Sequence, residues 1–444
     1  MSTPHSASGT FGHPGGAGRS GEYHALLARH DAMRLRRMLL APARPGGPGG
    51  PGAAAGPGAA GGPESPGTAA QAVILRDLPL VTPFDALIGD LYDAMFERHP
   101  YLRSLFPDSM EFQRRHLAEM FGYLIEHLDR PDEIEATCAR LGRDHRKLGV
   151  RPAHYQTFEV ALREALRRRA GAHWTEELDW AWVEMLRFAV RAMVAGADAA
   201  LTEPPYWHAD VTGHDRRGPD LAVLRVRPRE PYPYRAGQHG AVESPLLPHS
   251  WRQYSFACAP DPAGEVEFHV RAVGPGGVSE ALVAHTRVGD TVRLGPAHGG
   301  MTLDEEFPGD LLLVAGGTGW ATAKSLLQEL AARRPAPPGV HLFLGAREEA
   351  GPYDGDAVAE LARRPWLRVH RTVGPGVSPV QELERHGDWS GHLAYVSGPP
   401  GMVAAAVAEL TALGVPTDRI RHDPLPLTSG ALPGPAAPVP ATAR

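Results

Sequence analysis

Trp251-Arg-Gln-Tyr-Ser-Phe-Ala257 is a run of residues with strand propensity, and the rest of the chain can be arranged on either side of it. Strand alternation places Arg252 and Tyr254 on one face. Gln253 and Ser255 point to the other face. An arginine beside a tyrosine can hold a phosphate and a flat ring together. Such a tetrapeptide alone is more often an ordinary strand, so its meaning depends on the motifs around it.

Two motifs flank this strand. Tyr234-Arg-Ala-Gly-Gln238 precedes it, and Gly276-Gly-Val-Ser279 follows it and opens a helix-like run to His285. Backbone N–H groups at a helix start can bind phosphate oxygens. In this order the three motifs resemble the flavin-binding barrel of the ferredoxin–NADP reductase family. The resemblance implies an FAD site made of Arg252, Gln253, Tyr254, Ser255, Gly276, Gly277, Val278 and Ser279.

Composition narrows the classes of protein. The 444 residues suffice for two or three domains, and the net charge of −6, with no basic stripe, excludes a nucleic-acid partner. The two cysteines, Cys138 and Cys258, have neither metal-ligand spacing nor a disulfide framework. No apolar run approaches the length of a membrane span, and the N-terminus lacks the apolar core of a signal peptide. We therefore expect a cytoplasmic protein.

The two ends of the chain differ from its body. Residues 1–72 are predicted to be a disordered extension, with a Pro/Gly/Ala linker after position 41. Within it, Glu22–Leu40 has the apolar pattern of a short helix. This helix either docks on an unknown partner or on the body of the protein, or is a marginal helix in a tail. Residues 427–444 resemble the linker in composition and are predicted to be a second disordered tail.

From Val73 to Ala200 the apolar spacing is helical throughout, which predicts an all-α domain of about six helices. A lone histidine on an apolar helix is more often structural than a ligand, but here several candidates occur at related places. They are Tyr92, Phe106, Gln113, Leu117, His145 and Tyr155.

This series resembles the globin domain of flavohaemoglobins. The resemblance implies that Tyr92 is the distal tyrosine that donates to bound oxygen. It assigns Gln113 as the distal glutamine and Leu117 as the apolar residue over the iron. A tyrosine hydroxyl can donate to a charged ligand in a dry pocket.

On the proximal side the same resemblance makes His145 the haem iron ligand, and a neutral imidazole suits that role. Tyr155 matches the tyrosine that contacts this histidine, and Phe106 the phenylalanine packed on the porphyrin. The family also has a glutamate here, near the end of the last helix. The corresponding stretch, Met193–Ala200, has none; Asp198 is the nearest carboxylate. Loss of that carboxylate would lower the basicity of the histidine.

From about Trp207 the pattern changes to short strands separated by Gly/Pro turns, which predicts a small antiparallel barrel. After it, Leu311–Ala315 reads as a buried strand followed by a glycine-rich turn and a helix. Repetition of this pattern indicates a parallel α/β domain. The turn contains Gly316, Gly317, Thr318 and Gly319, whose backbone can approach a pyrophosphate.

This turn and Ser397-Gly-Pro-Pro-Gly-Met402 are similar to the two nicotinamide-site motifs of the same reductase family. The resemblance assigns Ser397, Gly398 and Pro399 to the cofactor site. Departures are present: Thr322 replaces a usual proline, and Ser397 a common cysteine. Asp423 stands for the family's C-terminal acid, but Leu425 replaces the aromatic that shields the flavin. Arg347 could meet a ribose 2′-phosphate, so NADH and NADPH both stay open.

We therefore predict a multidomain flavohaemoglobin-like oxidoreductase with haem b, FAD and NAD(P)H as cofactors. The resemblance implies that electrons pass from NAD(P)H through FAD to haem iron, and that NO and O2 are converted to nitrate. Two alternatives stay open: a globin-coupled reductase or haem-based sensor with another acceptor, and a degenerate globin that serves as a binding protein. The predicted organisation is an extension at 1–72, a globin domain at 73–200, an FAD-binding β-barrel domain at 206–305, an NAD(P)-binding α/β domain at 308–426 and a tail at 427–444.

Overall fold

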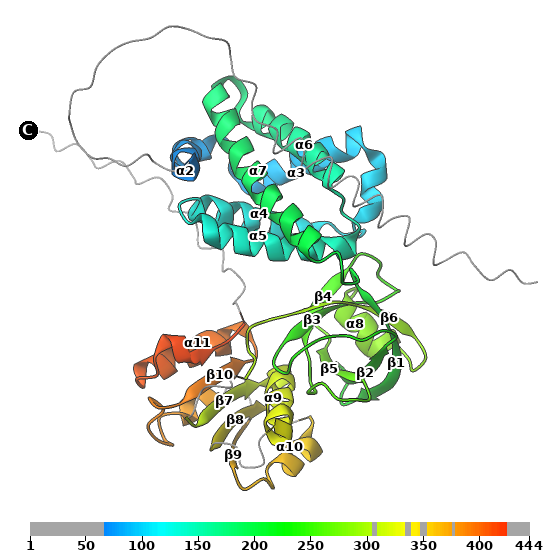
Figure 1. The fold of residues 1–444 in the computed structure, drawn as a ribbon, viewed down its shortest axis with the longest axis vertical. Coiled ribbons are helices and arrows are strands. Elements are labelled where there is room, and N and C mark those ends of the chain that lie inside the picture. Colours follow the sequence, from blue (N-terminus) through cyan, green and yellow to red (C-terminus); the bar gives the residue numbers. More distant parts are fainter. Residues whose placement is uncertain (1–65, 304–308, 334–338, 347–352, 375–377, 424–444) are drawn as a thin grey trace, which may run out of the picture. The chain divides into compact units, whose positions relative to one another are not determined.

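The computed structural model describes residues 66–303, 309–333, 339–346, 353–374 and 378–423. The predicted helix at 22–40, the tail from 427, Arg347 and Leu425 lie outside the described residues. The chain divides into two compact units. The first comprises residues up to Leu105 together with Glu111–Glu203; the second comprises Phe106–Met110 and the chain from Pro204 onward. The predicted combination of an all-α domain, an antiparallel barrel and a parallel α/β domain is confirmed (Figure 1).

The first unit contains six described α-helices, coloured blue to green in Figure 1. They are α2 (Pro66–Asp77), α3 (Phe84–Arg98), α4 (Glu111–His127), α5 (Pro131–His145), α6 (Pro152–Ala170) and α7 (Glu176–Ala199). The helical part begins at Pro66, so the prediction that disorder extends to residue 72 is wrong. The reason is burial, because Ala70, Val73 and Ile74 are each less than one-tenth exposed.

Two glycines let α5 and α7 approach to backbone contact. A Cβ added at Gly142 of α5 would lie 1.9 Å from the carbonyl oxygen of Met193 on α7. A Cβ at Gly196 of α7 would lie 2.0 Å from the carbonyl oxygen of Ala139 on α5. Neither position has room for a side chain, so these glycines fix how closely the last turns of α5 pack on α7.

The second unit begins with a six-stranded antiparallel sheet in the order β4-β3-β6-β1-β2-β5. Its strands are β1 (Trp207–Arg216), β2 (Leu221–Pro228), β3 (His239–Glu243), β4 (Trp251–Ser255), β5 (Val266–Arg271) and β6 (Thr291–His298). A bridge between Phe256, directly after β4, and Phe268 of β5 joins the two edge strands and closes the barrel. Both phenylalanines are fully buried in its core. A short helix, α8 (Val278–Glu280), continues as a π-helix over Ala281–His285.

The five-stranded sheet that follows is parallel throughout, in the order β11-β10-β7-β8-β9. Its strands are β7 (Leu311–Gly316), β8 (Val340–Ala346), β9 (Leu367–Val373), β10 (Leu393–Ser397) and β11 (Ile420–Arg421). The helices that alternate with them are α9 (Trp320–Arg333), α10 (Gly355–Leu361) and α11 (Pro400–Ala412).

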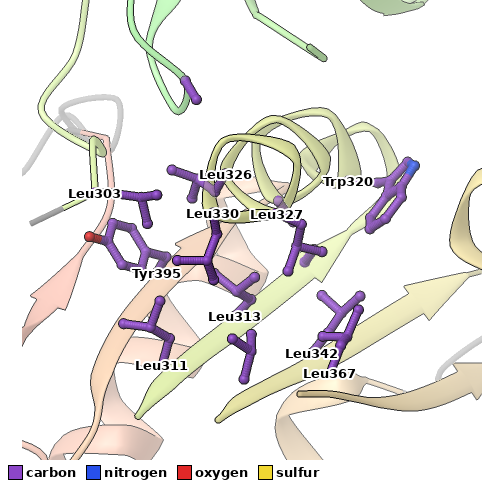
Figure 2. Close-up of a cluster of buried hydrophobic side chains, with 14 of the residues drawn as sticks. Leu303, Leu311, Leu313, Trp320, Leu326, Leu327, Leu330, Leu342, Leu367 and Tyr395 are labelled. Carbon is purple, nitrogen blue, oxygen red and sulfur yellow. The ribbon is translucent and has the colours of Figure 1, made fainter. Parts of the chain in front are cut away.

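Both faces of this sheet are covered, as parallel strands require. Leu311 and Leu313 of β7 share one buried cluster with Leu327 and Trp320 of α9 (Figure 2). Leu312, between them, belongs to a second cluster on the opposite face, which is covered by α11. This two-sided burial explains why β7 reads as a continuous apolar run in the sequence. Within the described part of the chain, no helix is long and apolar enough to span a membrane.

Candidate functional site

His145, the predicted iron ligand, is the last residue of α5. Its Nδ1 lies 2.8 Å from the carbonyl oxygen of Leu141. A carbonyl only accepts, so Nδ1 carries the proton and the lone pair is on Nε2. This is the tautomer that a metal-binding imidazole needs, with its other nitrogen oriented by a backbone bond.

Burial keeps the ring of His145 neutral. Burial lowers the pKa of the imidazole; the Leu141 carbonyl and Asp144 oppose that effect, and Lys147 and His116 add to it. Asp144 is itself 3.2 Å from the Lys147 ammonium. A neutral ring with a free Nε2 lone pair fits the requirements of haem iron.

On the distal side, Tyr92 lies on α3 and is 6% exposed. Burial raises the pKa of its hydroxyl to about 12, with Arg114 of α4 opposing, so the hydroxyl stays protonated and can donate. Gln113 is the residue before Arg114, and its Oε1 is buried with no hydrogen-bond partner. An orphaned buried amide oxygen is costly and is typical of a binding site. Leu117 follows one turn later and is half-buried.

For the other two predicted haem-pocket residues, Tyr155 and Phe106, the structure gives the position in the fold but does not test the predicted contact. Tyr155 is near the start of α6, and burial raises the pKa of its hydroxyl, with Cys138 as the second cause. Phe106 directly follows the 3₁₀ helix Pro100–Leu105 and groups with the second unit. The contact of Tyr155 with His145 and that of Phe106 with a porphyrin therefore stay predictions.

The stretch in which the family has a glutamate, Met193–Ala200, packs closely on α5. It includes Gly196, which lies against Ala139. Asp198 is half-buried, and the carboxylate that raises the pKa of His145 is Asp144. The close approach of α5 and α7 leaves no space for a long acidic side chain at Gly196 itself.

The predicted flavin strand is β4, paired with β3 so that Tyr254 opposes Gly240 and Ser255 opposes His239. Arg252 and Gln253 are exposed, as a phosphate contact requires. Burial raises the pKa of Tyr254, yet its hydroxyl oxygen has no hydrogen-bond partner. A buried tyrosine normally satisfies its hydroxyl, so this orphan fits a polar ligand such as a flavin ribityl chain.

The second flavin motif is a turn followed by α8. Gly276 has φ of +74°, a conformation that favours glycine, and a Cβ on Gly276 or Gly277 would meet nothing within 4 Å. The turn is therefore open to a close ligand. Val278 and Ser279 are buried, and the Ser279 hydroxyl accepts from the Val273 N–H at 3.2 Å. Gly276 N–H donates to Glu280, so a phosphate here would compete with that carboxylate.

Asp423, the predicted C-terminal acid, lies beside the barrel. Its Oδ2 is 3.4 Å from Nδ1 of His239, the residue that pairs with Ser255. A Cβ on Gly299 would come within 3.0 Å of the same His239 nitrogen. The structure thus brings Asp423 to β3, the strand that pairs with the flavin strand β4. The proximity of His239 was not predicted, since nothing in the local sequence links it to a residue so distant in the chain.

The two nicotinamide motifs meet at the carboxyl ends of β7 and β10, which are adjacent parallel strands. A Cβ on Gly319 would lie 2.3 Å from the carbonyl oxygen of Ser397, and one on Gly316 would lie 2.4 Å from Sδ of Met402. The Ser397 hydroxyl donates to the carbonyl of Gly319 at 2.8 Å. Thr318 and Gly317 complete the turn, with φ of +55° at Gly317. Ligands in open α/β sheets bind at this edge.

Sequence analysis missed a buried polar cluster between the barrel and the α/β domain, centred on Lys324 and Glu267. One signal could have revealed it. The chain has 45 lysines and arginines, but only two of them are lysines, Lys147 and Lys324. A lysine in an apolar helix of an arginine-rich chain indicates a position where the guanidinium is unsuitable.

Comparison with known proteins agrees with this arrangement. Residues 89–193 match the globin family, and residues 209–302 match the oxidoreductase FAD-binding domain family. The chain is 25% identical over 380 residues to a flavohemoprotein of Chromobacterium violaceum, covering 76% of this chain and 92% of that protein. The flavohemoglobin of Malassezia yamatoensis, with FAD and heme bound, shares the fold at a TM-score of 0.67 and 18% identity, covering 81% of this chain and 99% of that one.

The chain also resembles the reductase components of oxygenase systems. It is 32% identical to a ferredoxin–NAD(P)+ reductase component of the naphthalene 1,2-dioxygenase/salicylate 5-hydroxylase systems of a Ralstonia species, covering 48% of this chain and 67% of that protein. It is 32% identical to the naphthalene 1,2-dioxygenase reductase component of Pseudomonas putida, of whose length it spans 64%.

The fold and the matches define a class: a globin domain joined to an FAD-binding reductase of the ferredoxin–NAD(P)+ reductase type. The chain is thus a fusion of the flavohaemoglobin type. A globin domain implies haem, an FAD-binding domain implies FAD, and the reductase module uses NAD(P)H. The orphaned Gln113 and Tyr254 oxygens and the free Nε2 of His145 show that the residues present fit these groups.

Proposed function

We propose that this flavohaemoglobin-type protein oxidises NAD(P)H and uses the electrons to convert NO and O2 to nitrate. The observation that carries the proposal is the pairing, in one helical unit, of an oriented neutral histidine with a protonated buried tyrosine, His145 and Tyr92. When bound, FAD would divide the electron pair of NAD(P)H and haem would supply the place where O2 and NO react.

The protein's own residues would bind and orient the cofactors and would exclude water from the pocket. His145 would hold the iron through Nε2 while Leu141 fixes the ring plane. Tyr92 would donate a hydrogen bond to the bound oxygen, and Gln113 and Leu117 would line the same pocket. In the reductase, Arg252 would contact the FAD phosphates, and the Gly316–Gly319 turn would receive the dinucleotide.

One observation favours a second function. The glutamate typical of the family is absent, and Gly196 packs on α5 in the same stretch. Less electron donation to the iron suits a haem reductase with another acceptor, or a haem-based sensor. The location in the cytoplasm and a partner for the N-terminal segment stay predictions.

The test is NO consumption by the full-length, haem- and FAD-loaded protein with NADH or NADPH. The proposal requires O2-dependent NO loss with nitrate formed as NAD(P)H is oxidised. One electron, one NO and one O2 give one nitrate, so each NAD(P)H should serve two NO molecules. Rapid ferricyanide reduction without NO turnover would reject the dioxygenase and favour the second function.

A further inference from the structure

A cluster of buried charged and aromatic side chains lies where the barrel meets the α/β domain. We call its members the buried polar cluster: Glu267, His269, Trp320, Lys324, Tyr353 and Asp354. Strand β5 of the barrel supplies the first two, and α9 the next two. The last two directly precede α10. The cluster therefore joins two elements of the nucleotide domain to one strand of the flavin barrel.

Lys324 is the centre of the cluster. Its Nζ lies 2.6 Å from Oε1 of Glu267 and 3.3 Å from Oδ2 of Asp354. The three side chains are 12%, 10% and 9% exposed. Removing one partner of such a buried arrangement leaves an uncompensated charge, so the three groups hold one another in place. The second oxygen of Glu267 accepts from Nε of Arg225 at 2.9 Å, a contact that lies entirely within the barrel.

The protons in the cluster can be assigned. Burial alone would raise the pKa of Glu267, but bonds from His269 and Lys324 hold it at about 2, so this carboxylate only accepts. Nε2 of His269, 3.0 Å away, therefore donates to it. Burial lowers the pKa of His269 and raises that of Tyr353, so Nδ1 of a neutral ring accepts from the tyrosine hydroxyl at 2.6 Å. The Tyr353 hydroxyl and Nε2–H of His269 therefore each have one acceptor, which fixes the orientation of both rings.

The cluster is connected to the first nicotinamide motif through α9. Helix α9 begins directly after the Gly316–Gly319 turn, and its first residue, Trp320, donates from Nε1 to Asp354 at 2.9 Å. Figure 2 shows the indole at the start of α9, beside the ends of the strands. Farther along α9, Ser325 accepts from the Gly237 N–H of the barrel at 3.0 Å. The helix is thus fastened to the barrel at more than one point.

We propose that Lys324 is a positioning residue for hydride transfer: held between Glu267 and Asp354, it fixes the nucleotide turn of the α/β domain against the flavin barrel. The inference rests on the proposed NAD(P)H-to-FAD step. With both cofactors bound, that step would move a hydride from the nicotinamide, which is oxidised, to the flavin, which is reduced. Such a transfer needs reacting atoms about 3–3.5 Å apart, and a displacement of about 1 Å can cost a hundredfold in rate.

Lysine suits this position better than arginine does. Its ammonium is compact and can lie between two carboxylates that converge from different domains, whereas the guanidinium is larger and presents its donors in a rigid planar fork. Arg225, which lies beside the cluster, binds Glu267 and Asp215, both of them carboxylates of the barrel. We therefore expect Lys324→Arg to disturb the junction although the charge is kept.

The test uses full-length protein loaded with FAD, under anaerobic conditions and without NO. Flavin reduction by saturating NADH or NADPH is followed by stopped-flow absorbance in wild type, Lys324→Met and Lys324→Arg. Arg225→Met is the matched control, because it also removes a cation from Glu267 but only inside the barrel. FAD content, the Kd for NAD+ or NADP+ and the calorimetric unfolding profile are measured on the same samples.

The expected result is a reduction rate at least about tenfold lower in Lys324→Met, with FAD content and dinucleotide Kd within about twofold of wild type. Arg225→Met should lower the unfolding temperature without slowing reduction. Equal slowing in both variants, or unchanged rates in Lys324→Met, would overturn the positioning role. If wild type itself shows no flavin reduction, the proposed function is wrong. That outcome differs from one in which wild type is reduced normally and only the positioning role of Lys324 is rejected.

A milder variant covers the case in which Lys324→Met does not fold. Tyr353→Phe keeps the ring and removes only the hydroxyl that donates to His269. We expect it to slow reduction by a smaller factor than Lys324→Arg, again with unchanged FAD content and dinucleotide Kd. A rate equal to wild type in both Tyr353→Phe and Lys324→Arg would reject the proposal.

Discussion

Nδ1 of His145 donates to the carbonyl oxygen of Leu141, four residues earlier on the same helix, at 2.8 Å. His127 makes the same bond to Tyr123 at 2.9 Å. The bond alone therefore does not define a haem ligand. The two rings differ in their surroundings, since His127 stacks on the Tyr123 ring at 4.1 Å and its Nε2 lies 3.8 Å from Glu133. That makes His127 a matched control for His145.

His145→Ala should abolish or scramble haem binding while the flavin spectrum stays intact, because the two sites lie in separate units. His127→Ala removes the same local bond and should keep the haem-to-protein ratio of wild type. Visible spectra and pyridine haemochrome content of both purified variants give the measurement. A normal five-coordinate ferrous spectrum in His145→Ala, without added imidazole, would show that another residue is the ligand.

The contact between α5 and α7 gives a stability prediction. Gly142→Ala places a Cβ 1.9 Å from the Met193 carbonyl, so the two helices must separate. We expect the free energy of unfolding of the helical unit to fall by about 1–3 kcal/mol, because backbone atoms cannot move aside as a flexible side chain can.

Gly122→Ala on α4 is the control, since a Cβ there meets nothing within 4 Å. It should stabilise by up to about 1 kcal/mol through helix propensity. Urea unfolding followed by far-UV circular dichroism would compare them, and equal shifts would contradict the packing argument.

The sequence predicted local chemistry better than long-range proximity. The strand with Arg252 and the turn with Gly319 have short signatures, because glycine and strand patterns act within a few residues. The pairing of His239 with Asp423, and of Glu267 with Lys324, joins residues far apart in the chain. The spacing of apolar residues along the sequence does not predict such contacts, because they depend on how the sheets close and on which helix covers which face.

Arg252→Ala should weaken FAD binding. The side chain is exposed on β4, where its guanidinium can reach a phosphate. Loss of a charge-assisted bond costs about 1.5–3 kcal/mol, or tenfold to a hundredfold in Kd. Arg227→Ala removes another exposed arginine of the barrel, 3.9 Å from Glu265, and should leave FAD affinity unchanged. Fluorescence titration of the FAD-stripped proteins measures both. Full FAD retention by Arg252→Ala through dialysis would remove this arginine from the site.

His341 should make the α/β domain sensitive to acid. Burial, followed by His370, Arg368 and His392, lowers its pKa from 6.5 to about 4, and Asp310 opposes the shift. Between these values the unfolded chain binds a proton that the folded chain does not, so stability falls as the pH drops from 6.5 to 4.

His341→Gln should therefore flatten the decline in urea midpoint over that interval. The exposed His173 of the helical unit supplies the control, His173→Gln, for removing a histidine elsewhere. An unchanged slope in His341→Gln would show that other groups produce the decline.

The distal pocket allows the sharpest test of function. Tyr92 is buried on α3, with its ring stacked on Phe96 at 5.8 Å. Tyr92→Phe keeps this packing and deletes only the hydroxyl. A hydrogen bond to the partly anionic O2 ligand would be worth about 1.5–3 kcal/mol, so O2 should dissociate roughly tenfold to a hundredfold faster. Carbon monoxide carries little charge on its oxygen, and its dissociation should change much less.

If the Tyr92 hydroxyl serves only the core, the dissociation rates of both gases will show similar, small changes. Flash photolysis and stopped-flow measurement of both off-rates decide between these outcomes, and equal shifts for the two ligands would reject Tyr92 as the distal donor.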